Sequence, residues 1–265
     1  MCLILFSYDE HPTYRLVLAA NRDEYYNRPA EPAKLWDDIP GMLAGRDLEQ
    51  MGTWLGVTAE GKFSAITNFR APALFRPDAL SRGKLVSSYL AGTLGPGDYL
   101  EYIKKESHLY NPFNLLVGDK TSLFFYSSLG EDVERVTPGI HGLSNQLLDV
   151  PWPKVVQGTE KLRAYLNNSD RVEPSGLFAI LADTTRAKDS CLPDTGVGIE
   201  RERELSPIFI EKTEYGYGTR SSTVLLIERF NHVLFVERTF NGSPDRLRQE
   251  VTCECDIGWP VFTFR

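Results

Sequence analysis

Residues 2–24 read CLILFSYDEHPTYRLVLAANRDE, and this stretch carries the strongest evidence about the fold. Two runs rich in aliphatic and aromatic residues, Cys2 to Tyr8 and Tyr14 to Asn21, flank a polar turn that contains Pro12, which is typical of a β-hairpin. In the first run, apolar residues occupy both alternating positions, so both faces of that strand are expected to be covered. The hairpin therefore predicts a sheet with a packed layer on either side.

The rest of the chain groups its strands and helices. Beyond a loop with several prolines, at residues 29–40, we expect strands at 52–58, 62–67, 113–117, 123–127, 219–228, 232–239 and 259–264, and helices at 84–91, 98–107, 154–166 and 175–182. Residues 184–204 mix charge, Pro and Gly, which predicts a long surface excursion. Grouped strands covered on both faces favour an α+β fold with two stacked antiparallel sheets between helices, and we expect residues 1–265 to form one such domain.

Composition excludes several classes of protein. Of the 265 residues, 36 are acidic and 29 basic, an excess that argues against binding to nucleic acid. The four cysteines, Cys2, Cys191, Cys253 and Cys255, have spacings that favour neither a disulfide framework nor a structural metal site. The apolar run after Cys2 is short and acidic residues follow it, unlike a secretory signal, and no segment reaches the ~18 apolar residues of a membrane span. We therefore expect a cytoplasmic protein.

Cys2 is the residue that could carry chemistry. Removal of Met1 would leave a chain whose first residue holds both a thiol and a free α-amine, a nucleophile and a candidate base. In the predicted hairpin Cys2 lies beside the end of the second strand, where Arg22 could lower the thiol pKa and Asp23 could hold the amine. A surface salt-bridge cluster is the alternative. Because neighbours on a strand face opposite ways, both side chains can face Cys2 only if the strand bends.

Two asparagines follow apolar segments in the same way. Asn68 ends the run 63–67 and Asn145 ends the run 140–144, so each could donate its amide to an oxyanion, although capping of a strand end is the simpler explanation for either one. Arg220 enters an apolar strand; it is either a solvated edge charge or, inside a cleft, a ligand for a carboxylate.

These residues belong to motifs that are spread over the whole chain. They read MC at 1–2, LAANRDE at 18–24, RP at 28–29, GTWLG at 52–56, TN at 67–68, YN at 110–111, FNL at 113–115, HGLSN at 141–145 and YGTR at 217–220. In these motifs the sequence resembles the NRDE family, which includes the transport and Golgi organisation 2 proteins. That family resembles in turn the N-terminal nucleophile hydrolases, above all those of the choloylglycine hydrolase and penicillin V acylase type. The resemblance implies a four-layer αββα sandwich.

Site roles follow from the resemblance position by position. It implies that Cys2 is the nucleophile with its own amine as base, and that Arg22 and Asp23 are the partners of thiol and amine. Asn68 and Asn145 become oxyanion or amine contacts. Asn21 and Arg220 become substrate contacts. The choloylglycine hydrolase branch separates its Arg and Asp by two residues, whereas here they are adjacent, so Glu24 could replace Asp23.

Three functions remain open. The first is a cysteine amidohydrolase or acyltransferase that attacks an amide or thioester through an acyl-enzyme and needs no cofactor. The second, which the family resemblance also implies, is a non-catalytic carrier of haem or of acyl-coenzyme A and lipids. Haem needs an axial ligand, for which the chain offers only four histidines, His11, His108, His141 and His232, besides its cysteines, Met and Tyr. The third is a hydrolase fold that has lost activity and serves as an interaction module.

Overall fold

The computed structural model describes residues 2–258 and 262–264, and within these ranges the strands form two seven-stranded antiparallel sheets. The first sheet has the order β10-β1-β2-β11-β12-β13-β14, with β1 Cys2–Tyr8, β2 Tyr14–Tyr25, β10 Gly139–Leu143, β11 Tyr217–Glu228, β12 His232–Phe240, β13 Leu247–Asp256 and β14 Thr263–Phe264. The second runs from β3 to β9 in chain order, with β3 Ala30–Leu35, β4 Met42–Asp47, β5 Leu55–Thr58, β6 Phe63–Asn68, β7 Phe113–Gly118, β8 Leu123–Ser127 and β9 Glu134–Arg135.

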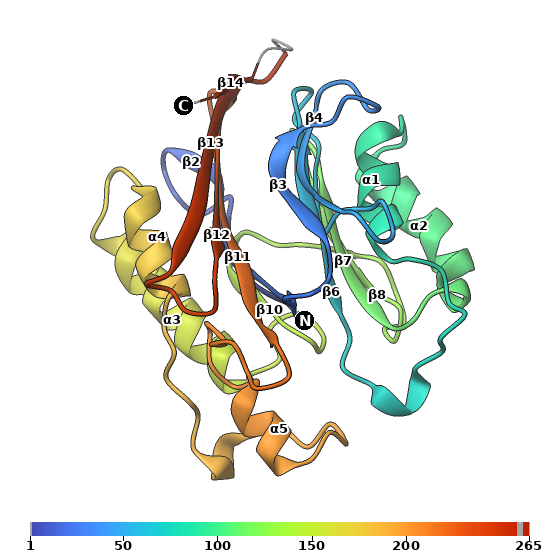
Figure 1. The fold of residues 1–265 in the computed structure, drawn as a ribbon. Coiled ribbons are helices and arrows are strands. Elements are labelled where there is room, and N and C mark those ends of the chain that lie inside the picture. The colour runs from blue at the N-terminus through green and yellow to red at the C-terminus, as the bar shows by residue number, and fades with distance from the viewer. Residues whose placement is uncertain (1, 259–261, 265) are drawn as a thin grey trace.

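Helices cover the outer face of each sheet, which completes the expected αββα layers (Figure 1). Helices α3, Pro153–Asn167, and α4, Pro174–Leu181, pack on the first sheet, and α1, Gly83–Ala91, and α2, Pro96–Glu106, pack on the second. Each of these four helices begins and ends within two residues of the bounds expected from the sequence. Short helices η1 Pro72–Leu74, η2 Ser107–Leu109, η3 Asp189–Cys191 and α5 Ile199–Glu204 lie in connections. Proline at the first turn of α2, α3 and α4 marks where they begin.

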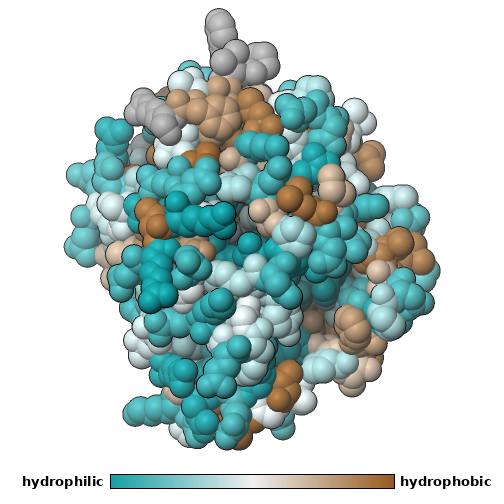
Figure 2. All heavy atoms as spheres, in the orientation of Figure 1, coloured by the Kyte–Doolittle hydropathy of each residue, from teal (hydrophilic) through white to brown (hydrophobic). Residues whose placement is uncertain are grey.

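The first strand shows why the sheet has two covered faces. Ile4 and Phe6 belong to the core between the sheets, whereas Leu3 and Leu5 belong to the core under α3 and α4. Apolar residues at both alternating positions therefore serve two different cores, as the sequence predicted. The surface in the orientation of Figure 1 is mainly hydrophilic, with apolar side chains in small scattered groups (Figure 2).

Several expectations about elements were wrong. The second strand does not end at Asn21; β2 continues to Tyr25 because β1 and β11 pair with it on both sides. The proline-containing loop at 29–40 holds β3, since an edge strand tolerates Pro32 where its pairing shifts register. Strand β13 was missed, although Val251, Cys253 and Cys255 alternate along it. Of the strand expected at 259–264, residues 259–261 lie outside the described residues.

Candidate active site

A cavity of about 220 Å³ opens beside the first residue of β1, between the ends of β2 and β6. Four of the expected site residues line it, namely Cys2, Arg22, Asp23 and Asn68, and so does Glu24. The antiparallel pairing of β1 with β2 is responsible, because it sets Cys2 directly opposite Arg22. The hairpin therefore brings the thiol and the polar end of β2 together, as the sequence predicted.

Arg22 faces the space between the two sheets. It shares this face of β2 with Leu18 and Ala20, which lie in the inter-sheet core. Its guanidinium stacks on Trp54, with 4.3 Å between Cζ and the ring centroid, and makes no hydrogen bond to any described residue. Trp54 in turn covers Gly45, where a Cβ would come within 2.3 Å of the ring. The indole thus holds a buried guanidinium whose donors stay available to a ligand.

Asp23 faces the opposite side of the sheet, toward the helices. Its Oδ1 accepts a hydrogen bond of 2.7 Å from Thr219 Oγ1, and its carbonyl accepts one of 3.1 Å from Tyr217 Oη. Burial raises the pKa of the Asp23 carboxyl, and the nearby ammonium of Lys154 opposes this rise. The β-bulge of this region lies on β11 between Thr219 and Ser221, so β2 keeps its alternation and does not bring both side chains to Cys2.

The state of the Cys2 thiol differs from the expectation. Burial raises its pKa, and this effect exceeds the opposing influence of Arg22. Arg22 lowers the thiol pKa, as expected, but the pKa is still raised overall, because the desolvation cost of a thiolate outweighs this neighbouring charge. A proton acceptor is needed to generate the nucleophile. Met1, whose removal would expose the α-amine, lies outside the described residues.

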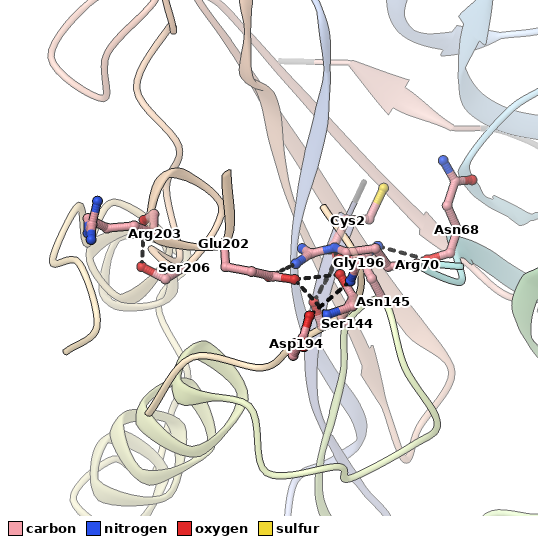
Figure 3. A network of polar contacts seen from close by, with 11 residues as sticks. Cys2, Asn68, Arg70, Ser144, Asn145, Asp194, Gly196, Glu202, Arg203 and Ser206 are labelled. Atoms are coloured by element: carbon pink, nitrogen blue, oxygen red, sulfur yellow. Dashed lines mark hydrogen bonds and ion pairs between the residues drawn. The ribbon is translucent and has the colours of Figure 1, made fainter. Parts of the chain in front are cut away.

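The two asparagines are linked to each other (Figure 3). Asn145 Nδ2 donates to the main-chain carbonyl of Asn68 at 2.8 Å, and Ser144 Oγ donates to the carbonyl of Cys2 at 3.4 Å. In Figure 3 the side chains of Cys2 and Asn68 rise on the same side of this network. Asn145 does not line the cavity, so here it positions the strand that carries Asn68.

The segment 184–204 is more than a surface excursion, which corrects that expectation. Glu202 of α5 is 3% exposed and forms an ion pair with Arg70, which is also buried. The same carboxylate accepts hydrogen bonds from the backbone N–H and the hydroxyl of Thr195. Arg70 Nη2 also donates to Asn145 Oδ1 at 3.5 Å, and its backbone N–H donates to the Asn145 carbonyl at 2.7 Å. A buried charge pair therefore ties this segment to the asparagine network.

Asn21 and Arg220 do not line this cavity. Asn21 Nδ2 donates to the carbonyls of Leu181 and Ile208, both at 2.9 Å, and its Oδ1 accepts from Ser222 at 2.5 Å, so its amide connects the sheet to the helix side. Arg220 Nη1 donates to the carbonyl of Tyr25 at 3.1 Å and to that of Arg28. Arg220 lines a second, smaller cavity instead.

Sequence reasoning missed three basic residues near the thiol. Arg82, the residue before α1, lines the cavity and donates to the Pro112 carbonyl at 3.1 Å. Arg28 lines it as well and pairs with Asp47 at 2.8 Å. Lys154 in the first turn of α3 is 2% exposed, and its Nζ has no hydrogen-bond partner among the described residues. Arg28 belongs to the RP motif at 28–29, although no role at the site was expected for it. No sequence pattern indicated that Arg82 or Lys154 would lie near Cys2.

The described residues contain no group of three His, Cys, Asp or Glu side chains placed to hold a metal ion. His11 Nδ1 accepts from the backbone N–H of Thr13 at 3.2 Å, His141 contacts Asp149 at 2.7 Å, and His232 contacts Asp256 at 3.0 Å. In residues 2–258 and 262–264, no helix is long and apolar enough to cross a bilayer.

Two stacked antiparallel sheets between helices are the fold that solved N-terminal nucleophile hydrolases share. Solved structures with this fold match most of the chain. A *Caenorhabditis elegans* N-acylethanolamine-hydrolyzing acid amidase orthologue matches with a TM-score of 0.50 and 11% identity, over 85% of this chain and 92% of that one. A mutant of the conjugated bile acid hydrolase from *Clostridium perfringens* matches with a TM-score of 0.51 and 10% identity, over 100% and 96%.

By sequence, the chain belongs to the Transport and Golgi organisation 2 family, whose model matches residues 1–242. The Transport and Golgi organization 2 homolog of *Mus musculus* is 36% identical over 257 residues, which cover 90% of this chain and 93% of the relative. The Transport and Golgi organization protein 2 of *Drosophila melanogaster* is 28% identical over 264 residues, 91% and 93% of the two chains.

Proposed function

We propose that the protein is an N-terminal-cysteine hydrolase of amide or thioester bonds that works through an acyl-enzyme. One observation carries the proposal: Cys2 lines a cavity directly opposite Arg22 and together with Asn68. The fold shared with an amidase and a bile acid hydrolase supports it. The cavity is charged and hydrogen-bonding rather than apolar, which suits an acyl substrate with polar groups.

The reaction begins with proton transfer. After removal of Met1, the α-amine of Cys2 accepts the thiol proton, because burial keeps the thiol protonated at neutral pH. The sulfur attacks the carbonyl carbon, and the amide of Asn68 donates to the developing oxyanion. When the carbon–nitrogen or carbon–sulfur bond breaks, the ammonium returns its proton to the leaving group. Water, deprotonated by the same amine, then attacks the thioester, and the released sulfur recovers the proton.

Roles for the two charged neighbours follow from their positions. Arg22, whose guanidinium has no hydrogen-bond partner among the described residues, is placed to bind a polar group of the substrate. Asp23 lies on the helix side of β2, where its Oδ1 accepts a hydrogen bond from Thr219 Oγ1. Its carboxylate, which acts electrostatically on the Cys2 thiol, is placed to orient the amine.

Replacement of Cys2 by Ala tests the proposal. We expect loss of turnover by at least ~10³-fold on acyl p-nitroanilides and acyl thioesters, because the nucleophile is gone. Cys191→Ala is the matched control and should keep full activity, since Cys191 is an exposed free thiol that does not line the cavity. Intact-mass measurement should show a mature chain that begins at Cys2 and an added acyl group after rapid quenching.

Two results would contradict the hydrolase. One is active protein that retains Met1; the other is turnover unchanged by Cys2→Ala. Saturable binding of haem or acyl-coenzyme A to the wild type and to Cys2→Ala alike, with no acyl-enzyme, would favour the carrier instead.

A further inference from the structure

A row of polar side chains crosses five adjacent strands at one end of the first sheet. The register pairs Cys2 with Arg22, Arg22 with Ser221, Ser221 with Thr239, and Thr239 with Gln249. Residues directly opposite each other share a face of the sheet, and here it is the face that looks toward the second sheet. With strands about 4.8 Å apart, Ser221 lies about 10 Å and Thr239 about 14 Å along the sheet from Cys2. The row leads away from the nucleophile.

A second cavity, of about 110 Å³, lies along this row. Arg22 and Trp54 line both cavities, so their stacked side chains separate the two spaces. Ser221, Thr239 and Gln249 line only the second one. The second cavity is therefore a direct neighbour of the candidate active site, with the stacked Arg22 and Trp54 side chains between them.

Two hydroxyl groups at this cavity are buried without a partner. Ser221 Oγ and Thr239 Oγ1 are shielded from solvent, and neither makes a hydrogen bond within the described residues. A buried polar group without a partner costs about 1–3 kcal/mol, so proteins rarely leave two side by side. Both belong to residues that line the same cavity, where a bound group could accept hydrogen bonds from them.

The charges around the cavity favour an anion. Arg22, Arg220 and Arg248 line it, and burial, then Arg22 and to a smaller extent Arg248, lower the pKa of Arg220. The part of this lowering that comes from Arg22 and Arg248 is repulsion between guanidinium groups, and an anion bound in the cavity would relieve it. The bulge on β11 contributes, because it makes Arg220 the extra residue beside Ser221.

Two carboxylates line the cavity as well. Glu31 is paired with Lys34 at 2.8 Å, so its charge is balanced. Glu237 accepts a hydrogen bond of 2.7 Å from the backbone N–H of Ala33. Burial raises its pKa to about 7, so near neutral pH it is in part protonated. Three cations face at most one unbalanced carboxylate.

We propose that the second cavity is an anion subsite, in which Ser221, Thr239 and Arg248 bind a carboxylate or phosphate group carried by the substrate at its end remote from the bond cleaved at Cys2. Cleavage of the substrate at Cys2 rests on the proposed hydrolase function, whereas binding of an anion in the second cavity does not. The subsite would select acyl substrates that carry a second, anionic end group.

Equilibrium binding tests the subsite without catalysis. Inorganic phosphate and glutarate are titrated separately by calorimetry, at low ionic strength and pH 6.5, into wild type, Arg248→Gln and Thr239→Val. Loss of a charged hydrogen bond should weaken the preferred anion about tenfold or more in Arg248→Gln, and loss of the hydroxyl several-fold in Thr239→Val. The matched control is Arg246→Gln, because Arg246 is an exposed arginine two residues away that does not line the cavity. Tighter binding of glutarate identifies a carboxylate, and tighter binding of phosphate a phosphate group.

A substrate series tests the link to Cys2. Mono-p-nitroanilides of linear dicarboxylic acids of graded length are compared with their methyl esters, and the free carboxylate should be preferred at one chain length. That preference should disappear in Arg248→Gln and remain in Arg246→Gln. Equal anion binding in both variants, or no saturable binding to wild type, overturns the subsite even if hydrolysis occurs. Anion binding that depends on Arg248, with no hydrolysis of any compound, keeps the subsite and contradicts the proposed hydrolase function.

Discussion

At the scale of single residues, the thiol of Cys2 is subject to opposing effects on its pKa. Burial raises the pKa, while Arg22 lowers it. The guanidinium stacks on Trp54, which gives it an apolar support but also turns its donors toward the cavity. The thiol therefore stays protonated until a base takes the proton, which favours proton transfer coupled to attack over a preformed thiolate.

Lys154 is a second residue at which burial of a charge opposes folding. It lies at the first turn of α3, where the helix dipole disfavours a cation, and burial lowers its pKa from 10.5 to about 8. Between pH 8 and 10.5 the unfolded chain binds more protons than the folded one, so this group makes stability rise with pH in that window. Below pH 8 the lysine is charged in both states, so the full free-energy cost of burying its ammonium applies.

Lys154→Met should therefore raise the free energy of unfolding at pH 7 by up to about 3 kcal/mol. The gain should shrink as the pH rises from 8 toward 10, because the wild-type lysine becomes neutral. Urea unfolding at pH 7 and 9.5 measures this, with the exposed Lys84→Met as control. A pH-independent gain would contradict the buried charge.

The same substitution, Lys154→Met, should also change the pH dependence of activity. Lys154 opposes the rise in the Asp23 pKa that burial causes, so Lys154→Met should raise that pKa further. The acid limb of the pH–rate profile should then move to higher pH, which a purely structural role would not produce. Unchanged acid limbs in Lys154→Met and Lys84→Met would show that Lys154 does not position charge at the site.

At the scale of elements, β2 shows how pairing overrides local composition. Four polar residues, 21–24, follow its apolar run, and such a cluster usually indicates the end of a strand. Here β1 and β11 pair with residues in this cluster, so the strand continues. Alternation then sends Arg22 to the inner face and Asp23 to the helix side. One short polar cluster thereby places one side chain between the two sheets and the next one among the helices.

The segment that carries α5 depends on one buried ion pair. Removing one partner of a buried pair leaves an uncompensated charge, so Glu202→Gln should destabilise the protein by about 3–5 kcal/mol. Limited proteolysis should also cut residues 184–204 faster. The double variant Arg70→Met/Glu202→Leu should recover part of the loss, because no charge then remains buried.

A control for this prediction lies on the same helix. Arg203 pairs with Asp189 at 2.7 Å, but these side chains are 36% and 56% exposed, far more than those of Arg70 and Glu202. Arg203→Gln should therefore cost less than about 1 kcal/mol. Equal effects of Glu202→Gln and Arg203→Gln would contradict a special role for the buried pair.

At the scale of the whole molecule, Glu237 links the two sheets. It belongs to β12 of the first sheet and accepts the backbone N–H of Ala33 in β3 of the second at 2.7 Å. Burial raises its pKa from 4.5 to about 7, and Ala33 and Arg22 offset only part of this. Between pH 4.5 and 7 the folded protein binds more protons than the unfolded chain, so this group lowers stability as the pH rises.

Glu237→Gln should therefore be more stable than wild type at pH 8, by up to about 3 kcal/mol, since glutamine keeps an acceptor for Ala33 without the charge. The difference should diminish as the pH falls toward 4.5. Urea unfolding at pH 5, 6, 7 and 8 measures it, with Glu250→Gln as a control, because Glu250 is an exposed partner of Arg238 on the neighbouring strand. A constant difference at all four pH values would show that the carboxylate does not titrate in this range.

Local pattern alone determined the layers of this protein and the neighbourhood of its thiol. Apolar residues at both alternating positions of 3–6 required two cores, and a short turn in residues 9–13 required Cys2 to lie near Arg22. Helical spacing located α1 to α4. All of these depend on contacts between residues close in the chain, or on periodicity within one element.

Tertiary structure alone decided the rest, because the deciding contacts join distant residues. β11 keeps β2 extended past Asn21, α3 brings Lys154 toward Asp23, and Glu202 reaches Arg70 from 132 positions away. The net pKa of Cys2 depends on how much of the fold shields it from water. Burial and long-range charge are properties of the assembled layers, and no local sequence pattern encodes them.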